Sequence, residues 1–294
     1  MDAPALRPLR VGEVIDVAVK VYTRNAATLL KIAFVVIAPV QILGALILLS
    51  SVPDPSETAT TTGAFGFIPW TLVAGFTAAF LLQWVSTTLT TGACYKTIAG
   101  AYLDRAPGWK ESLAFGRRRL GRMLWLAFLQ GVITLIGLIA CIAPGVWLAV
   151  SYSVAMPAML TEDLRAPRAL GRAIRLVQGR WWATFGVVTL GFLLAFVVEI
   201  VLSIGVELVT PAIGAVVLAV ALSTATSIVT GVLVTPFQAA VATVLYFDLR
   251  VRKEALDLEL LTRRVGTPAG GAPAPPPPPS SSPGWKAPEP PRAS

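Results

Sequence analysis

The sequence from Ala166 to Gly186 is APRALGRAIRLVQGRWWATFG, and it sets the fold that we expect. Arg168, Arg172 and Arg175 recur at helical spacing on one side of a helix. The other side carries an apolar stripe, made of Leu170, Ile174, Val177 and Trp181. A long apolar run follows at once, so the pattern predicts a basic amphipathic helix that lies at the membrane interface and leads into a membrane span.

The composition indicates an integral membrane protein. Of the 294 residues, 55% are hydrophobic and 14% are charged, and the apolar residues fall in runs too long for a soluble core. The net charge of +8 comes from basic residues that lie beside these runs. This placement indicates a basic membrane-proximal face and argues against nucleic-acid binding.

The apolar runs predict an all-α fold, a polytopic membrane helix bundle with about six transmembrane helices in three pairs. The expected spans are residues 29–49, 68–100, 123–143, 146–160, 183–206 and 212–247. Turn signals at Pro144-Gly145 and Thr210-Pro211 separate spans three and four, and spans five and six. Spans two and six exceed a hydrocarbon core of about 30 Å, so each is either tilted or kinked, or broken in two. Pro39 and Pro236 are the expected kinks of spans one and six.

A cytoplasmic amphipathic interfacial helix is expected before each pair of spans. These three lead-in helices cover residues 11–25, residues 104–122 and the stretch that begins at Ala166. In the first, Asp16 and Lys20 form a favourable i,i+4 pair on the polar side. All three would lie along the membrane before the chain turns into it.

The C-terminal part of the sequence differs in composition from the rest. Residues 248–264 predict a charged cytoplasmic helix, and the proline-rich residues 266–294 predict a disordered tail. The run Pro275–Pro279 either docks on an aromatic groove as polyproline II or is part of a passive linker. The predicted domains are therefore a membrane domain over 1–265 and a disordered tail over 266–294.

The distribution of charge predicts the topology. This threading puts all 24 Lys and Arg residues on one side of the membrane, whereas the opposite loops contain only Asp54, Glu57 and Glu207 as charges. The positive-inside rule therefore predicts that both termini are cytoplasmic.

One candidate site is a contact for anionic lipid on the third lead-in helix. Its cations are Arg165, Arg168, Arg172, Arg175 and Arg180. They either anchor the helix to anionic headgroups in a generic way or form a dedicated headgroup or phosphate site. The neighbouring acids Glu162 and Asp163 are expected to form salt bridges with Arg165 or Arg168.

A candidate intramembrane polar site consists of Glu199 and Ser203 in span five. An intramembrane carboxylate suggests a proton or cation pathway. However, Glu199 lies about 25 Å along the helix from Trp182, which places it near the outer headgroups. We therefore favour an outer-edge polar residue.

Span six carries small residues at four-residue spacing, which predicts a helix-packing seam. The candidate seam consists of Ala219, Ser223, Ser227 and Gly231, and Thr235 continues its spacing. A second polar group, Thr224, Thr226 and Thr230, either lines a cavity or bonds back to its own helix.

Nothing in the sequence predicts an enzyme. The chain has no histidine, and its two cysteines, Cys94 and Cys141, lie in apolar runs. No phosphate-binding glycine loop, nucleophile elbow or metal-ligand cluster is present in the sequence. We therefore expect no catalytic, cofactor-binding or metal-binding residues, and no cofactor.

Four blocks of the sequence resemble a bacterial family. They are RPLRVGEVIDVAVKVYTRN from Arg7, PGVWLAV from Pro144, ALGRAIRLVQGRWW from Ala169, and PFQAAVATVLYFDLRVRKEALD from Pro236. In this order they resemble the glycerophosphoryl diester phosphodiesterase membrane domain family. The resemblance implies a multi-span bundle in a bacterial cell membrane with no established activity of its own. Some members carry a catalytic barrel, but the histidines that it needs are absent here, so that activity is not carried over.

The leading functional hypothesis is a non-enzymatic plasma-membrane protein that organises lipid or scaffolds a membrane partner. The alternative is a transporter or lipid-handling bundle, suggested by the repeated helix pairs, Glu199 and the prolines at 39, 157 and 236. A membrane accessory to a separately encoded phosphodiesterase is the third. The expected partners are anionic lipid headgroups on the cytoplasmic side, with a protein partner or homo-oligomer left open and no nucleic acid.

Overall fold

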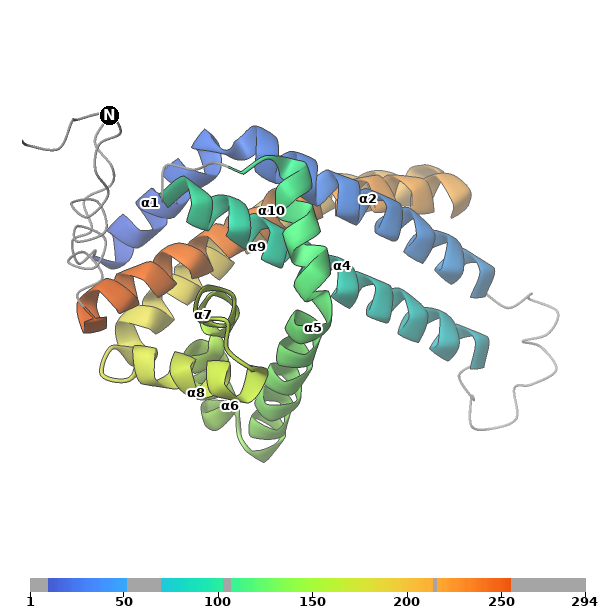
Figure 1. Ribbon diagram of the computed structural model, residues 1–294. Helices are drawn as coiled ribbons and strands as arrows, with labels where there is room; N and C mark the ends of the chain where they lie inside the picture. The colour runs from blue at the N-terminus through green and yellow to red at the C-terminus, as the bar shows by residue number, and fades with distance from the viewer. Residues whose placement is uncertain (1–9, 52–69, 103–106, 214–215, 255–294) are drawn as a thin grey trace, which may run out of the picture. The chain divides into compact units, whose positions relative to one another are not determined.

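The computed structural model describes residues 10–51, 70–102, 107–213 and 216–254, and these residues are helical with short connections (Figure 1). The helices are α1 (Val11–Arg24), α2 (Ala26–Ser51), α4 (Trp70–Tyr102), α5 (Trp109–Ala140), α6 (Ile142–Tyr152), α7 (Ala155–Glu162), α8 (Ala166–Val177), α9 (Trp181–Ile213) and α10 (Val216–Glu254). The predicted all-α fold is confirmed for this part of the chain. Among the described residues, six segments are long and apolar enough to cross a membrane: α2, α4, α5, the α6–α7 pair, α9 and α10.

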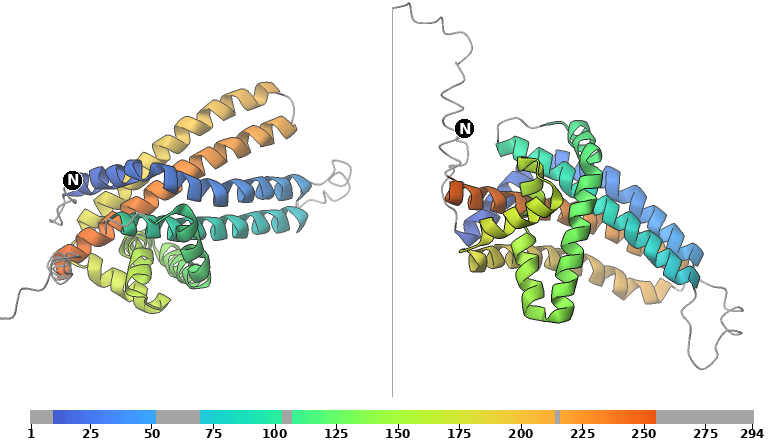
Figure 2. Two further views of the ribbon diagram at one scale, coloured as in Figure 1. Left: turned by 45° about the horizontal axis from the view of Figure 1, so that its top comes forward. Right: turned by 60° about the horizontal axis from the view of Figure 1, so that its bottom comes forward.

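The long helices pack side by side at several contacts. α2 runs along α4, α5 along α6, and α9 along α10 (Figure 2). Contacts also join these helices to one another, because α10 packs on α2 and α4, and α4 packs on α5. The six segments therefore form one connected bundle.

The expected second and sixth spans are each one helix. α4 has 33 residues and α10 has 39, and neither is broken, although Pro236 lies inside α10. The expected second lead-in helix is also continuous with the third span, as α5 of 32 residues. Gly121 is the only weak helix former at that junction, and one glycine inside a helix costs only about 1 kcal/mol.

Two predicted turns are wrong. The chain leaves α5 at Cys141, which is extended (φ −172°, ψ 150°), and Pro144-Gly145 lies in the first turn of α6. A proline fits there because the N–H that it lacks would have no helical partner. Thr210-Pro211 is not a turn either, since α9 continues through both residues to Ile213.

The fourth span is divided near its middle. Ser153 and Val154 form a turn between α6 and α7, and Pro157 lies in the first turn of α7. Pro157 has no N–H to donate to the carbonyl of Ser153, so a continuous helix would lose that hydrogen bond. Several predicted features lie outside the described residues: most of the loop at 51–67, residues 255–264 of the charged helix, and the tail at 266–294.

The core lies toward one end of the bundle. The largest fully buried side chains include Leu29 of α2, Ile98 of α4, Met123 of α5, Leu176 of α8 and Tyr246 of α10. Away from this core, large apolar side chains are exposed on every long helix, as at Leu46, Phe80, Ile139, Phe192 and Leu218. Exposed apolar surfaces of this kind are expected to face lipid.

The amphipathic helices α1 and α8 pack their apolar sides on protein. α1 buries Val14, Ile15 and Ala18, and it contacts α9 and α10. α8 buries Leu170 and Val177, which are 4% and 1% exposed, against a surface formed by α5, α6, α7 and α10. The stripe that we expected to enter the lipid interface is therefore covered largely by the bundle. Amphipathic spacing predicts a covered face, but it does not distinguish lipid from protein.

Candidate functional site

The turn between α7 and α8 is the most highly connected polar part of the described chain. Glu162 ends α7, and Asp163 follows in the left-handed conformation with φ 50°. Asp and Asn tolerate that conformation better than other residues that have a Cβ atom. Arg165 then precedes α8, and Pro167 occupies its first turn. The sharp reversal lets α8 pack on α7.

Glu162 joins three helices. Nε of Arg172 on α8 lies 3.0 Å from each of its carboxylate oxygens, and the hydroxyl of Tyr246 on α10 donates to Oε1 at 3.0 Å. The Arg172 and Glu162 side chains are each 20% exposed. An ion pair this poorly solvated needs its hydrogen bonds, so the three residues hold α7, α8 and α10 together.

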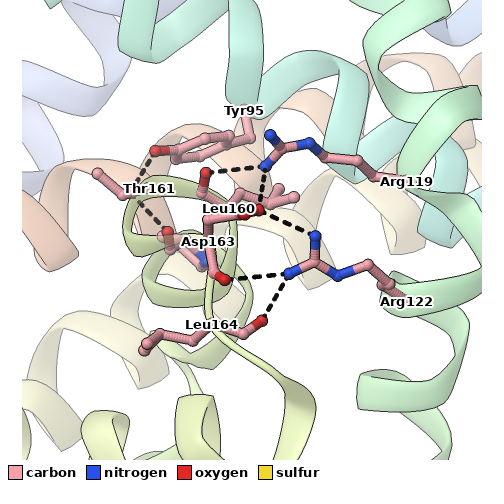
Figure 3. A network of polar contacts seen from close by, with 8 residues as sticks. Tyr95, Arg119, Arg122, Leu160, Thr161, Asp163 and Leu164 are labelled. Atoms are coloured by element: carbon pink, nitrogen blue, oxygen red, sulfur yellow. Dashed lines mark hydrogen bonds and ion pairs between the residues drawn. The ribbon is translucent and has the colours of Figure 1, made fainter.

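Two arginines of α5 form ion pairs with Asp163 (Figure 3). Nη1 of Arg122 lies 2.9 Å from Oδ1 of Asp163, and Nη1 of Arg119 lies 3.2 Å from the same oxygen. Arg122 also donates to the backbone carbonyls of Asp163 and Leu164, at 3.2 and 2.9 Å. These carbonyls follow the end of α7, where backbone oxygens have no helical partner.

Tyr95 of α4 approaches the same turn from another side (Figure 3). The hydroxyl of Thr161 donates to the carbonyl of Pro157 at 2.6 Å. Since a threonine hydroxyl has one proton, Tyr95 is the donor in its hydrogen bond with Thr161. The end of α7 thus binds side chains from α4, α5, α8 and α10.

The other end of α8 is held by a cation. Nζ of Lys253 on α10 donates to the carbonyl oxygens of Arg175 and Gln178, the latter at 2.9 Å. A lysine at a helix C-terminus bonds the free carbonyls and interacts favourably with the helix dipole.

The expected partners of the two acids were wrong. Glu162 pairs with Arg172, and Asp163 pairs with Arg119 and Arg122, in place of Arg165 or Arg168. The reversal at Asp163 brings the middle of α8 beside the end of α7. The partner of Glu162 is therefore Arg172, which lies about two helical turns after Arg165 and about one turn after Arg168. Arg119, Arg122 and Tyr246 were not singled out from the sequence, because their contacts depend on the packing of helices distant in the chain.

The five arginines of the candidate lipid contact fall into two groups. Arg172 is half-buried and paired with Glu162. Arg165, Arg168, Arg175 and Arg180 are exposed, and within the described ranges no carboxylate forms an ion pair with them. We call these four exposed arginines the basic face. Because α8 packs its apolar side on the bundle, Arg168 and Arg175 on its other side face outward. Arg165 precedes the helix and Arg180 follows it.

The candidate polar site in α9 is not a cluster. Glu199 is exposed, and the Ser203 hydroxyl donates to the backbone carbonyl of Glu199. Ser203 thus bonds back to its own helix and leaves the carboxylate of Glu199 at the surface.

The residues of the predicted packing seam on α10 differ in their surroundings: some pack closely on another helix, and others line a cavity. A Cβ atom on Gly231 would lie 3.2 Å from Cγ2 of Ile37, so Gly231 faces α2 closely. Ser223 and Ser227, in contrast, line a cavity of about 680 Å³ between α2, α4 and α10, and each hydroxyl donates to a carbonyl of its own helix. Ala219 is half-buried.

No protein-family model, curated protein or solved structure matches this chain. The resemblance to the membrane domain family therefore stays a prediction.

Proposed function

We propose that this is a non-enzymatic integral protein of the bacterial plasma membrane, with both termini in the cytoplasm, that organises anionic lipid through its basic face. The basic face consists of Arg165, Arg168, Arg175 and Arg180, as defined above. A scaffold for a membrane partner would use the same exposed surface, and the experiment below separates the two.

The observation that carries this proposal is the division among the arginines at one end of the bundle. Arg119, Arg122 and Arg172 form ion pairs with the acids of the α7–α8 turn. The four arginines of the basic face are exposed. A cation near an anionic leaflet contributes about 1 kcal/mol of binding free energy, so four of them favour anionic lipid substantially.

The arrangement of α8 supports contact with a surface. Its buried side fixes its position on the bundle, Glu162 holds Arg172 in the middle of the helix, and Lys253 holds its C-terminal end. Arginines on an anchored helix lose less conformational freedom on binding than arginines on a mobile loop. The positive-inside rule supports a cytoplasmic position for this end of the bundle.

The test is lipid retention measured by native mass spectrometry. The protein is extracted gently from membranes that contain phosphatidylglycerol and phosphatidylethanolamine. The variant Arg168→Gln/Arg175→Gln removes two charges from the basic face. As the control, Lys20→Gln/Arg24→Gln removes two exposed charges from α1, one of which is paired with Asp16. Arg172 is left intact because it pairs with Glu162.

We expect the natural chain to retain phosphatidylglycerol in preference to phosphatidylethanolamine. The α8 variant should lose this preference several-fold, and the α1 variant should keep most of it. Equal losses in both variants would mean generic attraction only. Equal retention of the two lipids by the natural chain would contradict the proposal, and a protein retained in place of lipid would favour the scaffold.

A further inference from the structure

A larger cavity lies between α4, α5, α6, α7 and α10, with a volume of about 1040 Å³. Phe80 of α4 and Leu135 of α5 line it, and they are 68% and 57% exposed on the surface that we assign to lipid. Tyr95 also lines it, and it is buried beside the α7–α8 turn. The cavity therefore follows α4 for about 22 Å, more than half of a hydrocarbon core of about 30 Å.

Polar side chains line this cavity although it lies within the candidate spans. Gln130 of α5 is half-buried and Gln238 of α10 is exposed on the surface that we assign to lipid. Both line the cavity, and no hydrogen bond to another described residue is found for either carboxamide. An unpartnered amide in an apolar medium costs several kcal/mol, roughly 2 to 7. Such groups are expected to meet a polar atom of a ligand.

Thr134 is a further polar residue of the cavity that lacks a partner among the described residues. Its hydroxyl oxygen is buried and has no hydrogen-bond partner within the part of the chain that the structure describes. Other threonines of the same cavity bond back to their own helices: Thr88 to the carbonyl of Trp84 at 2.8 Å, and Thr243 to that of Ala239 at 2.6 Å. A buried polar atom without a partner calls for an explanation. Because this oxygen is closed off from the cavity, a ligand there meets it only after the Thr134 side chain rotates toward the cavity.

Every described residue that lines the cavity is uncharged. Arg119 and Arg122, at the α7–α8 turn beside Tyr95, are paired with Asp163. A phosphate group inside the cavity would therefore be buried without a counter-charge, at a large cost. Amides and hydroxyls can instead bond the hydroxyl and ester groups of an uncharged lipid.

We propose that this cavity binds one uncharged lipid of the diacylglycerol class. Its chains lie along Phe80 and Leu135, and its hydroxyl and ester groups meet Gln130, Gln238 and Thr134. This inference goes beyond the proposed function and does not rest on it, because no residue of the basic face lines the cavity.

The test is photo-crosslinking of the full chain in phosphatidylcholine vesicles. One probe is a diacylglycerol with a diazirine on one acyl chain, and the other is a phosphatidic acid with the same chain. The two probes differ only in the phosphate. We expect the diacylglycerol to label peptides of α4, α5 and α10 several-fold more than the phosphatidic acid does, and excess unlabelled diacylglycerol to abolish the labelling.

Gly131→Phe fills the cavity. Gly131 lines it, and a Cβ atom built there meets nothing within 4 Å. The matched control is Gly205→Phe on α9, where an added Cβ also meets nothing within 4 Å and from which no residue lines the cavity. We expect Gly131→Phe to reduce the diacylglycerol labelling several-fold and Gly205→Phe to leave it unchanged.

A second variant, Gln130→Leu/Gln238→Leu, keeps the approximate side-chain volumes and removes the polar groups. It should also reduce labelling by the diacylglycerol several-fold. Equal labelling by the two probes, labelling that excess diacylglycerol does not compete, or full labelling of both cavity variants would overturn the proposal. The arginine variants should leave this labelling unchanged, so a failure here is separate from a failure of the basic face.

Discussion

Nε of Arg172 lies 3.0 Å from both carboxylate oxygens of Glu162, ten residues earlier in the chain. With each side chain only 20% exposed, this ion pair stands apart from the exposed arginines on the same helix. The ion pair gives Arg172 a structural role, so Arg172 is not part of the basic face.

Removing one partner of this pair should destabilise the protein. Arg172→Gln leaves the Glu162 carboxylate poorly solvated and without its cation, at a cost of about 3 kcal/mol, the low end for buried pairs. The double variant Arg172→Gln/Glu162→Gln should recover part of that loss, because no unpaired charge remains. Thermal unfolding in detergent measures both, and Arg175→Gln is the exposed control, with an expected change below about 0.5 kcal/mol. A control that loses as much stability as Arg172→Gln would contradict this role.

The contact between α5 and α6 should not tolerate a methyl group. A Cβ atom on Gly145 would lie 2.4 Å from Cγ and 2.8 Å from Cα of Leu138. Gly145→Ala therefore forces the helices apart, and we expect a loss of about 1–3 kcal/mol of stability. Gly121→Ala on α5 is the control, since its added Cβ meets nothing within 4 Å and alanine favours a helix. Equal melting temperatures for the two variants would show that this close approach is not present.

At Asp163, stability should depend more on the left-handed backbone conformation than on the charge of the side chain. Asp163→Asn keeps a residue that tolerates φ 50° and removes the carboxylate from ion pairs that are 64% exposed at the acid. Such pairs contribute about 0–1 kcal/mol. Asp163→Val removes the same charge and puts a β-branched residue at positive φ, so we expect a further loss on the order of 1–3 kcal/mol. If valine and asparagine unfold at the same temperature, the left-handed turn is not present.

Much of the fold could be predicted because long apolar runs permit few structures in a membrane. All six expected spans correspond to segments of sufficient length and hydropathy, of which the fourth is the α6–α7 pair. The helix boundaries were less predictable where proline was the signal. Pro144, Pro157 and Pro211 all lie inside helices, and two of them are in a first turn, where a missing N–H costs little.

The site was predictable only in part, for a different physical reason. The exposed arginines of α8 follow from helical spacing within one short segment. The partners of Glu162 and Asp163 come from α5, α8 and α10, up to 84 residues away in the chain. Spacing along one helix carries no information about those contacts. The cavity residues Gln130 and Gln238 were missed because isolated amides in apolar runs have no periodic pattern.

The lipid proposal requires that the basic face lie on the cytoplasmic side, and cysteine labelling in intact cells tests this most directly. Cys141 between α5 and α6 is exposed, whereas Cys94 is buried. A membrane-impermeant maleimide should label the natural chain in intact cells, and Cys141→Ser should abolish that labelling. In the Cys141→Ser background, Arg168→Cys should be labelled only after the cells are permeabilised. Labelling of Arg168→Cys in intact cells would reverse the topology and contradict the proposed cytoplasmic lipid contact.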